Sequence, residues 1–306
     1  MRTTNLIGWI GVVLVTLAAG FWSFWGTIEA FHEGWWQPLL GMRLLQTAAY
    51  LSPAVVFSGV AVLGIRWPRV GAVLFILLGA VIATLIIIDR SSISIQIVLC
   101  LTALPMIVGL LFLFGRPQPK AAAYAVAVGI PLLILLGSGA EPVYRVCTRF
   151  DDGDRGERLV EGLGVTLVWA PAGPGWSRDG GVDWHEARER VRYLTEDGLS
   201  LANEPQGFWR LPTREEVVCS LTRGNRNAGG TWDPVRNQPH YKRKPDKESP
   251  LWDPFAPLIY LWTSDEADER SAWIVVYHGG IYPKPKTLAS PSIGFRAVRK
   301  PGATKL

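Results

Sequence analysis

Charged side chains are almost absent from the first 140 residues. Five apolar segments there contain no Asp, Glu, Lys, Arg or His: residues 6–25, 44–65, 70–88, 93–115 and 121–140. Each segment is close to the roughly 20 residues that a helix needs to cross the hydrocarbon core of a bilayer. An ionisable group inside a membrane is costly and is usually kept for function. The absence of such groups therefore argues against a transporter, a proton pump or a channel.

The chain also lacks the short motifs of several enzyme classes. It has no glycine-rich phosphate loop, no Gly-x-Gly-x-x-Gly, no Gly-x-Ser-x-Gly and no Cys-x-x-Cys. His185 and Glu186 are not followed by the second histidine of a zinc-protease helix. We therefore expect no cofactor, and we favour a non-enzymatic function over an enzymatic one.

Composition divides the chain near residue 140. Residues 1–140 carry 7 Lys/Arg and 3 Asp/Glu, whereas residues 141–306 carry 24 and 23. The second half is nearly neutral, which gives little support to nucleic-acid binding, since that needs a net basic surface. We predict a five-helix transmembrane bundle and then a polar domain. The expected divisions are a membrane domain over 1–140, a linker over 141–159, an α+β domain over 160–300 and a tail over 301–306.

The few charges of the membrane half favour one topology. Basic residues follow the second and fourth apolar segments, in 66–69 and 116–120, and Arg2 precedes the first segment. The positive-inside bias places all three in the cytoplasm. Five crossings then leave residues 141–306 outside, with membrane lipid as an expected partner. If the first segment were a signal peptide cleaved near Ala18-Ala19-Gly20, residues 141–306 would still lie outside.

Local signals in the second half predict two helices and several strands. Asp183 can cap a helix that ends near Asp197-Gly198, and Thr213 with Glu216 forms a capping box for a helix that ends at Gly224. Apolar runs predict strands over 165–169, 258–263, 272–277 and 295–298. Two helices followed by strands and long loops are typical of an α+β domain.

Three polar features allow more than one interpretation. The aspartates of 151–157 are spaced as in a calcium loop but lack its other ligands, so we favour a solvated turn. Lys242-Arg243-Lys244 can bind an acidic partner or lipid headgroups, but Asp246 and Glu248 follow directly and favour a solvated loop. His32 is not part of a constellation of His, Cys and carboxylate residues in the sequence, so we expect no metal site there.

One segment resembles a known family. Trp209, Arg210, Leu211, Pro212, Thr213 and Glu216 form the pattern Trp-Arg-Leu-Pro-Thr-x-x-Glu. This pattern resembles a segment of a C-type-lectin-like family that includes the Lcl C-terminal-like domain and the formylglycine-generating (sulfatase-modifying) enzymes. The resemblance covers roughly residues 160–300 and continues through Trp262-Thr263-Ser264, Trp273 and Gly294-Phe295-Arg296. It implies a C-type-lectin-like α+β fold in which Trp209, Trp262, Trp273 and Phe295 are buried.

The chain departs from the branches of this family that have known chemistry. The enzymes use two reactive cysteines late in the domain, and here no cysteine follows Cys219. The Glu-Pro-Asn and Trp-Asn-Asp motifs of calcium-dependent lectins are also missing. The resemblance therefore implies a fold without assigning catalytic or metal-binding residues. Trp232 and Trp252 lie in predicted loops. We expect these two aromatic residues to be available for stacking on a sugar.

The second half contains two cysteines, Cys147 and Cys219. Outside the cytoplasm they can form a disulfide, because that compartment is oxidising. Two free thiols are an equal alternative.

These observations predict a function in binding or assembly. We expect a protein of a bacterial plasma membrane that presents an extracytoplasmic module to another membrane protein, an extracytoplasmic protein or a glycan. Two alternatives remain. One is an oxidase of the formylglycine-generating type, or another enzyme on that scaffold. The other is an accessory subunit of a larger membrane complex.

Overall fold

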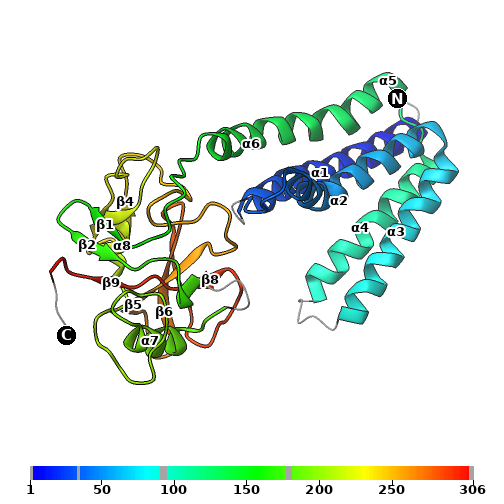
Figure 1. Cartoon of the computed structure of the whole chain (residues 1–306). Helices are drawn as coiled ribbons and strands as arrows, with labels where there is room; N and C mark the ends of the chain where they lie inside the picture. The colour runs from blue at the N-terminus through cyan, green and yellow to red at the C-terminus, as the bar shows by residue number, and fades with distance from the viewer. Residues whose placement is uncertain (1–2, 33–34, 90–94, 177–180, 303–306) are drawn as a thin grey trace. The chain divides into compact units, whose positions relative to one another are not determined.

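The chain forms two compact units (Figure 1). The computed structural model describes residues 3–32, 35–89, 95–176 and 181–302. The first unit contains Met1–Phe31 and Leu44–Pro142, and the second contains His32–Arg43 and Val143–Leu306. The segment between the first two helices thus belongs with the C-terminal part of the chain. Arg2, the start of the fourth apolar segment and most of the predicted tail lie outside the described residues.

The first unit is helical. Its elements are α1 (Thr3–His32), α2 (Leu40–Arg66), α3 (Pro68–Asp89), α4 (Ile95–Phe114), α5 (Lys120–Tyr124), the π-helical turn η1 (Ala125–Gly129) and α6 (Ile130–Cys147). The end of α1, the start of α2 and the end of α6 belong to the second unit. Within the described ranges, four helical stretches are long and apolar enough to cross a membrane: Thr3–His32, Leu40–Arg66, Pro68–Ile88 and Lys120–Cys147. The remaining predicted segment contributes the shorter apolar helix Leu101–Phe114. These helices fit a membrane protein.

Close packing holds the helices of the first unit together. A Cβ atom on Gly71 of α3 would overlap the Cα of Gly64 in α2, so a larger residue cannot be accommodated at this contact. The rings of Phe75 in α3 and Phe112 in α4 are fully buried and stack with their centroids 5.9 Å apart. Such close approach matters in lipid, because van der Waals packing has to replace the hydrophobic effect there.

The π-helical turn η1 comes directly before Pro131. Proline has no N–H to donate, and its ring would clash with the carbonyl of Ala127, four residues earlier. A wider turn at this point relieves the clash. The stretch Lys120–Cys147 therefore remains helical past the proline.

At one end of the first unit, the start of α1 is hydrogen-bonded to the loop after α4. The backbone N–H of Arg116 donates to the carbonyl of Thr4 over 2.8 Å, and that of Gln118 donates to Oδ1 of Asn5 over 2.7 Å. The indole N–H of Trp9 donates to the carbonyl of Gln118 over 2.9 Å. The basic loop after α4 and the N-terminal turn therefore lie at the same end of this unit.

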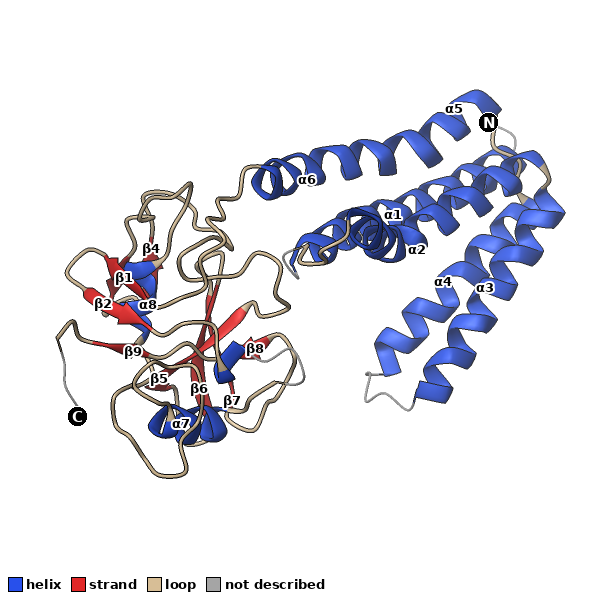
Figure 2. Cartoon of the chain, viewed as in Figure 1, coloured by secondary structure: helices blue, strands red, loops and turns tan. Residues whose placement is uncertain are grey.

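The second unit is rich in short strands (Figure 2). Its elements are β1 (Arg158–Glu161), β2 (Thr166–Trp169), η2 (Pro174–Trp176), α7 (Trp184–Tyr193), α8 (Arg214–Ser220), β3 (Thr231–Asp233), β4 (Gln238–His240), β5 (Tyr260–Glu266), β6 (Ser271–Val276), β7 (Ile281–Pro285), β8 (Ile293–Gly294) and β9 (Val298–Arg299). The strands form a sheet in the order β7-β6-β5-β8, a sheet in the order β1-β2-β9 and the hairpin β3-β4. Strands β5 and β8 are parallel, and the other neighbours are antiparallel.

Both faces of the four-stranded sheet are covered. Leu261 and Val275 belong to one buried cluster, which also contains residues of α8, and Trp262 and Ile274 belong to a second cluster with residues of α7. Successive residues of a strand point to opposite faces. A strand covered on both faces is apolar without interruption. This accounts for the apolar run Ala272–Val276 in β6 and for the apolar first three residues of β5.

The two helices of this unit begin where the sequence predicts. Oδ1 of Asp183 accepts from the backbone N–H of Glu186 over 2.8 Å, and the capping box of Thr213 and Glu216 is complete. Both helices end earlier than predicted, because Leu194 and Leu221 leave the helical conformation and their side chains enter the core. The predicted ends near 197–198 and 224 are therefore wrong.

The predicted strands are found with one exception. Strands β2, β5 and β6 lie within three residues of the predicted ranges 165–169, 258–263 and 272–277. Of the predicted strand 295–298 only Val298 is in a strand, β9, which pairs with β2, and residues 295–297 connect it to β8 (Ile293–Gly294), which pairs with β5. The chain changes sheet between them, where the backbone N–H of Phe295 donates to the carbonyl of Gly175.

Candidate binding surface

A cluster of two tryptophans and one arginine lies on the second unit. The guanidinium carbon of Arg214, in the first turn of α8, is 4.7 Å from the ring centroid of Trp232 and 4.8 Å from that of Trp273. Trp232 is in β3 and Trp273 is in β6, so three elements that are distant in the sequence meet here. All three side chains are partly exposed. We call these three residues the tryptophan–arginine stack.

Polar contacts fix Arg214 in this position. Its backbone N–H donates to Oδ2 of Asp265 over 2.5 Å, and its Nη1 donates to Oδ1 of Asn237 over 2.9 Å. Its Nε is 3.7 Å from the same oxygen of Asp265. Asn237 lies in the turn of the β3-β4 hairpin with a φ of 53°, a conformation that asparagine tolerates better than most residues. Contacts from β5 and from the hairpin thus orient the guanidinium.

Trp273 is less buried than its neighbours in β6. Ala272 and Ile274 in β6 are fully buried, whereas Trp273 between them is partly exposed. It was expected to be a buried packing residue, and the structure corrects this expectation. Trp273 faces the same side as Val275, where the cation of Arg214 lies over its ring.

The stack has the chemistry of a recognition surface. The neighbouring hairpin turn is open, with Val235 92% exposed. Indole rings offer flat apolar faces that a sugar or an aromatic group can cover. A guanidinium and an amide beside them supply donors for hydroxyl or anionic groups, and small-molecule sites typically combine apolar faces with a few placed polar groups.

Trp252, the other tryptophan that we expected at a ligand surface, is a core residue. Its side chain is 2% exposed, and its ring packs edge-on against Tyr277 with the centroids 6.4 Å apart. A ligand cannot reach it without unfolding of the core. Of the two expected aromatic residues, only Trp232 has an accessible surface.

The segment Trp209–Glu216 leads into α8 and forms its first turn. Trp209 is buried, and its indole N–H donates to the carbonyl of Thr195 over 2.9 Å. Leu211 is also buried, and the carbonyl of Pro212 accepts from the backbone N–H of Ser264 over 2.8 Å. These residues have structural roles.

Trp262 and Thr263 tie the sheet to α7. Trp262 is fully buried, and its indole N–H donates to the carbonyl of Val182 over 2.8 Å. The indole N–H of Trp184, at the start of α7, donates to the carbonyl of Thr263 over 2.8 Å. The hydroxyl of Thr263 in turn donates to the carbonyl of Trp273 over 2.9 Å.

The segment Gly294-Phe295-Arg296 is also buried. A Cβ atom on Gly294 would overlap the carbonyl oxygen of Gly175, so the close approach of the two chains requires glycine. Arg296 donates from Nε to the carbonyl of Ala170 over 2.7 Å and from Nη1 to the carbonyl of Pro250. Burial lowers the pKa of Arg296 to about 9.

Both cysteines of the second unit are free thiols. Cys147 is exposed at the end of α6, and Cys219 is buried in α8. Burial raises the pKa of Cys219, and the charges of Glu215 and Glu216 raise it further. A raised pKa keeps the thiol protonated at neutral pH, and the thiolate is the reactive form. Cys219 is therefore a poor nucleophile in this environment.

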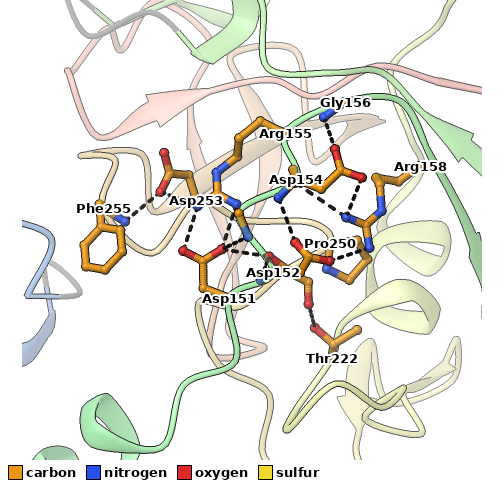
Figure 3. A network of polar contacts seen from close by, with 12 residues as sticks. Asp151, Asp152, Asp154, Arg155, Gly156, Arg158, Thr222, Pro250, Asp253 and Phe255 are labelled. Atoms are coloured by element: carbon orange, nitrogen blue, oxygen red, sulfur yellow. Dashed lines mark hydrogen bonds and ion pairs between the residues drawn. The ribbon is translucent and has the colours of Figure 1, made fainter.

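The aspartates of the linker pair with arginines (Figure 3). Arg155 lies 2.7 Å from Oδ1 of Asp151 and 3.1 Å from Oδ1 of Asp253, and Arg158 lies 2.8 Å from Oδ2 of Asp152. The hydrogen bond from Arg158 lowers the pKa of Asp152 to about 2. Over the part of the chain that the structure describes, no group of three or more His, Cys, Asp or Glu side chains is arranged to hold a metal ion.

His32 joins the loop after α1 to the second unit. Its Nε2 lies 2.7 Å from the hydroxyl oxygen of Tyr260, and the hydroxyl of Tyr277 donates to its carbonyl over 3.1 Å. The histidine is therefore part of the packing of this loop.

The residues that carry the resemblance to the C-type-lectin-like family all lie in the second unit, and most of them are buried. No protein-family model matches the chain, and no curated protein or solved structure is significantly similar to it.

Proposed function

We propose that this chain is a five-span protein of a bacterial plasma membrane that presents its second unit outside the cytoplasm as a non-catalytic binding module of C-type-lectin-like fold. The observation that carries the proposal is the partly exposed tryptophan–arginine stack, on a unit joined to membrane-spanning helices. A glycan is the ligand class that suits two indole rings and a guanidinium best.

The arrangement of the second unit supports the proposed fold. Two short helices cover a small sheet, and long loops connect the elements. Strand β2, near the start of the unit, pairs with β9, near its end, and so closes the unit on itself. The segment Trp209–Glu216 then has the structural role that the resemblance implies.

Chain connectivity supports the proposed topology. The loop that follows α1 belongs to the second unit, since His32 contacts Tyr260 and Arg43 lies 5.1 Å from the ring centroid of Phe255. A loop between the first two spans lies on the side of the membrane opposite to the N-terminus. Five spans place Val143 and the residues after it on that same side. The basic loops 66–69 and 116–120 then share the cytoplasmic side with the N-terminus, in agreement with the positive-inside bias.

The ligand assignment can be tested with the full chain in lipid nanodiscs on a glycan array. We expect saccharide binding by the wild type, loss of binding by Trp232→Ala and Arg214→Ala, and no loss by Tyr282→Ala. Tyr282 is an exposed aromatic residue of β7 and serves as the matched control. Saccharide binding that survives Trp232→Ala, or the absence of any bound saccharide, would reject the glycan assignment.

The placement of the second unit can be tested separately. External protease added to right-side-out vesicles should degrade residues 143–306. Protection of this region would overturn the proposed topology, whatever ligand the stack binds.

A second candidate function is that of an accessory subunit in a membrane complex. An apolar cavity of about 750 Å³ lies among α1, α2, α3 and α4, and its lining includes Phe21, Pro53, Leu85 and Leu101. An opening of this kind between helices suits an apolar segment of another membrane protein. Gentle detergent extraction followed by native mass measurement distinguishes a single chain from a stable complex.

A further inference from the structure

The two acidic residues after the basic segment Lys242-Arg243-Lys244 do not neutralise it. Asp246 is fully buried, and its Oδ1 is 3.0 Å from Nη2 of Arg145 and 3.0 Å from Nη2 of Arg149. Glu248 is also fully buried, with its Oε1 2.9 Å from Nη1 of Arg223. Their charges are compensated inside the unit. These two carboxylates therefore do not balance the charge of the basic segment, contrary to the expectation from the sequence.

The basic segment itself is on the surface and is held in shape. Lys242, Arg243 and Lys244 are all exposed. The backbone N–H of Arg243 donates to the carbonyl of Ala228 over 3.0 Å, and the hydroxyl of Tyr241 donates to the carbonyl of Gly279 over 3.1 Å. The bonds at Tyr241 and Arg243 hold the shape of residues 242–244, which we call the basic turn.

The basic turn lies beside the points where the second unit continues into membrane helices. Arg145, in the last turn of α6, donates from Nη2 to the carbonyl of Pro245 over 3.2 Å. Gly279, whose carbonyl accepts from the hydroxyl of Tyr241, follows His278, and the ring centroid of His278 is 6.2 Å from that of His32, the last residue of α1. Residues next to the ends of membrane-spanning helices lie at the level of the lipid headgroups.

Exposed apolar residues also occur where the unit borders the start of α2. Leu39, Leu40 and Met42, which precede or begin α2, are each at least 50% exposed. They belong to the segment His32–Arg43, which packs within the second unit. Apolar side chains next to cations are typical of a surface that lies on a bilayer, where burial in the acyl boundary and attraction to anionic lipids add together.

We propose that the basic turn binds the headgroups of anionic phospholipids in the bilayer that holds the protein's own helices. Each basic residue near an anionic surface strengthens the contact about fivefold, and the attraction falls off within a Debye length. The contact restricts how the second unit moves above the lipid. The proposal rests on the membrane-spanning helices, and it is independent of the ligand of the tryptophan–arginine stack.

The test uses the full chain in nanodiscs of phosphatidylcholine, alone or mixed with increasing phosphatidylglycerol, and measures amide hydrogen exchange of residues 241–244. We expect phosphatidylglycerol to slow exchange in the wild type. In Lys242→Gln/Arg243→Gln the slowing at the same phosphatidylglycerol fraction should be largely lost, because each removed cation weakens the contact about fivefold. Arg188→Gln/Arg192→Gln, an exposed pair on α7, removes the same charge and should behave as the wild type.

Three results would overturn the proposal. The first is equal exchange in the two lipid compositions, and the second is an unchanged lipid effect in Lys242→Gln/Arg243→Gln. The third is equal slowing by inorganic phosphate in phosphatidylcholine discs, which would assign the turn to free anions. If the double variant does not fold, the proposal can be tested with the wild type alone. About 0.5 M salt should then abolish the slowing of exchange by phosphatidylglycerol, because salt screens the attraction.

Discussion

Arg210 and Glu216 form a two-point ion pair across the start of α8. Nη1 of Arg210 is 2.7 Å from Oε2 of Glu216, and Nη2 is 2.6 Å from Oε1. Oε2 also accepts from the backbone N–H of Thr213 over 2.8 Å. Burial alone would raise the pKa of Glu216, but the bonds from Arg210 and Thr213 outweigh it, and the pKa is lowered. The Arg and Glu of the segment Trp-Arg-Leu-Pro-Thr-x-x-Glu thus fix the entry to the helix.

The substitution Glu216→Gln should destabilise the second unit by about 2 kcal/mol, because hydrogen bonds to a charged group contribute more than neutral ones. The measurement is thermal unfolding of the full chain in detergent, followed by tryptophan emission. Glu215→Gln removes the same charge from an exposed neighbour and serves as the control. Equal shifts in the two variants would contradict a specific role for the pair.

The substitution Arg214→Ala should cost about 1 kcal/mol and shift the tryptophan emission, since the cation covers two indole rings. Arg214→Lys keeps the charge but loses the planar group and the bond to Asn237, so its effect should be intermediate. Emission spectra and unfolding of both variants test this. An unchanged emission spectrum in Arg214→Ala would show that the rings and the cation do not interact in solution.

The substitution Asp246→Asn should destabilise the second unit by about 3 kcal/mol or more. Asp246 is fully buried and compensates Arg145, Arg149 and Arg223, and removing one partner of a buried charge network leaves the others uncompensated. Glu189→Gln, at an exposed position of α7, is the matched control and should have little effect. A small loss of stability in Asp246→Asn would mean that water reaches the arginines.

Local signals in the sequence predicted the helix starts well. Asp183 and Thr213 cap their helices through side chains that bind backbone groups three residues away, so the information lies within one turn. The helix ends were missed because Leu194 and Leu221 leave the helix to fill the core, which depends on distant residues. Strand β7 was missed because Pro283 and Pro285 argue against a strand, although an edge position tolerates them.

The candidate site was only partly predictable, because burial depends on tertiary contacts. Trp232 and Trp252 have similar sequence surroundings, yet Trp252 packs against Tyr277 while Trp232 stays at a hairpin edge beside Arg214. In the same way, Asp246 reads as a solvated charge until the chain brings Arg149 to it from 97 residues away. No local pattern contains this information.

Acidification should destabilise the second unit between about pH 6.5 and pH 4. The pKa of His278 is lowered from 6.5 to about 4, first by burial and then by the charges of His32, Arg145 and Lys244. In this window the unfolded chain binds a proton at this position that the folded chain does not, so stability falls as the pH falls. We expect a loss of about 2 kcal/mol, less than the full shift implies, because the ring is partly exposed.

Unfolding temperatures at pH 7 and pH 5 test this expectation. The variant His278→Asn should show a smaller difference between the two pH values than the wild type. His240→Asn, at an exposed position of β4, should keep the wild-type difference. A difference that is the same in all three proteins would assign the pH dependence to other groups.

The two cysteines should differ strongly in reactivity. In a Cys100→Ser background, the exposed Cys147 should react with a maleimide within minutes in the folded protein, whereas the buried Cys219 should react only after denaturation. Desolvation and two neighbouring carboxylates keep Cys219 protonated, which slows its reaction beyond the effect of burial. The measurement is the mass of labelled peptides before and after unfolding without reductant. Protection of both cysteines that is lifted only by reductant would identify a disulfide and contradict the free thiols. Rapid labelling of Cys219 in the folded protein would show that α8 opens to solvent and would reopen the case for a reactive cysteine in this unit.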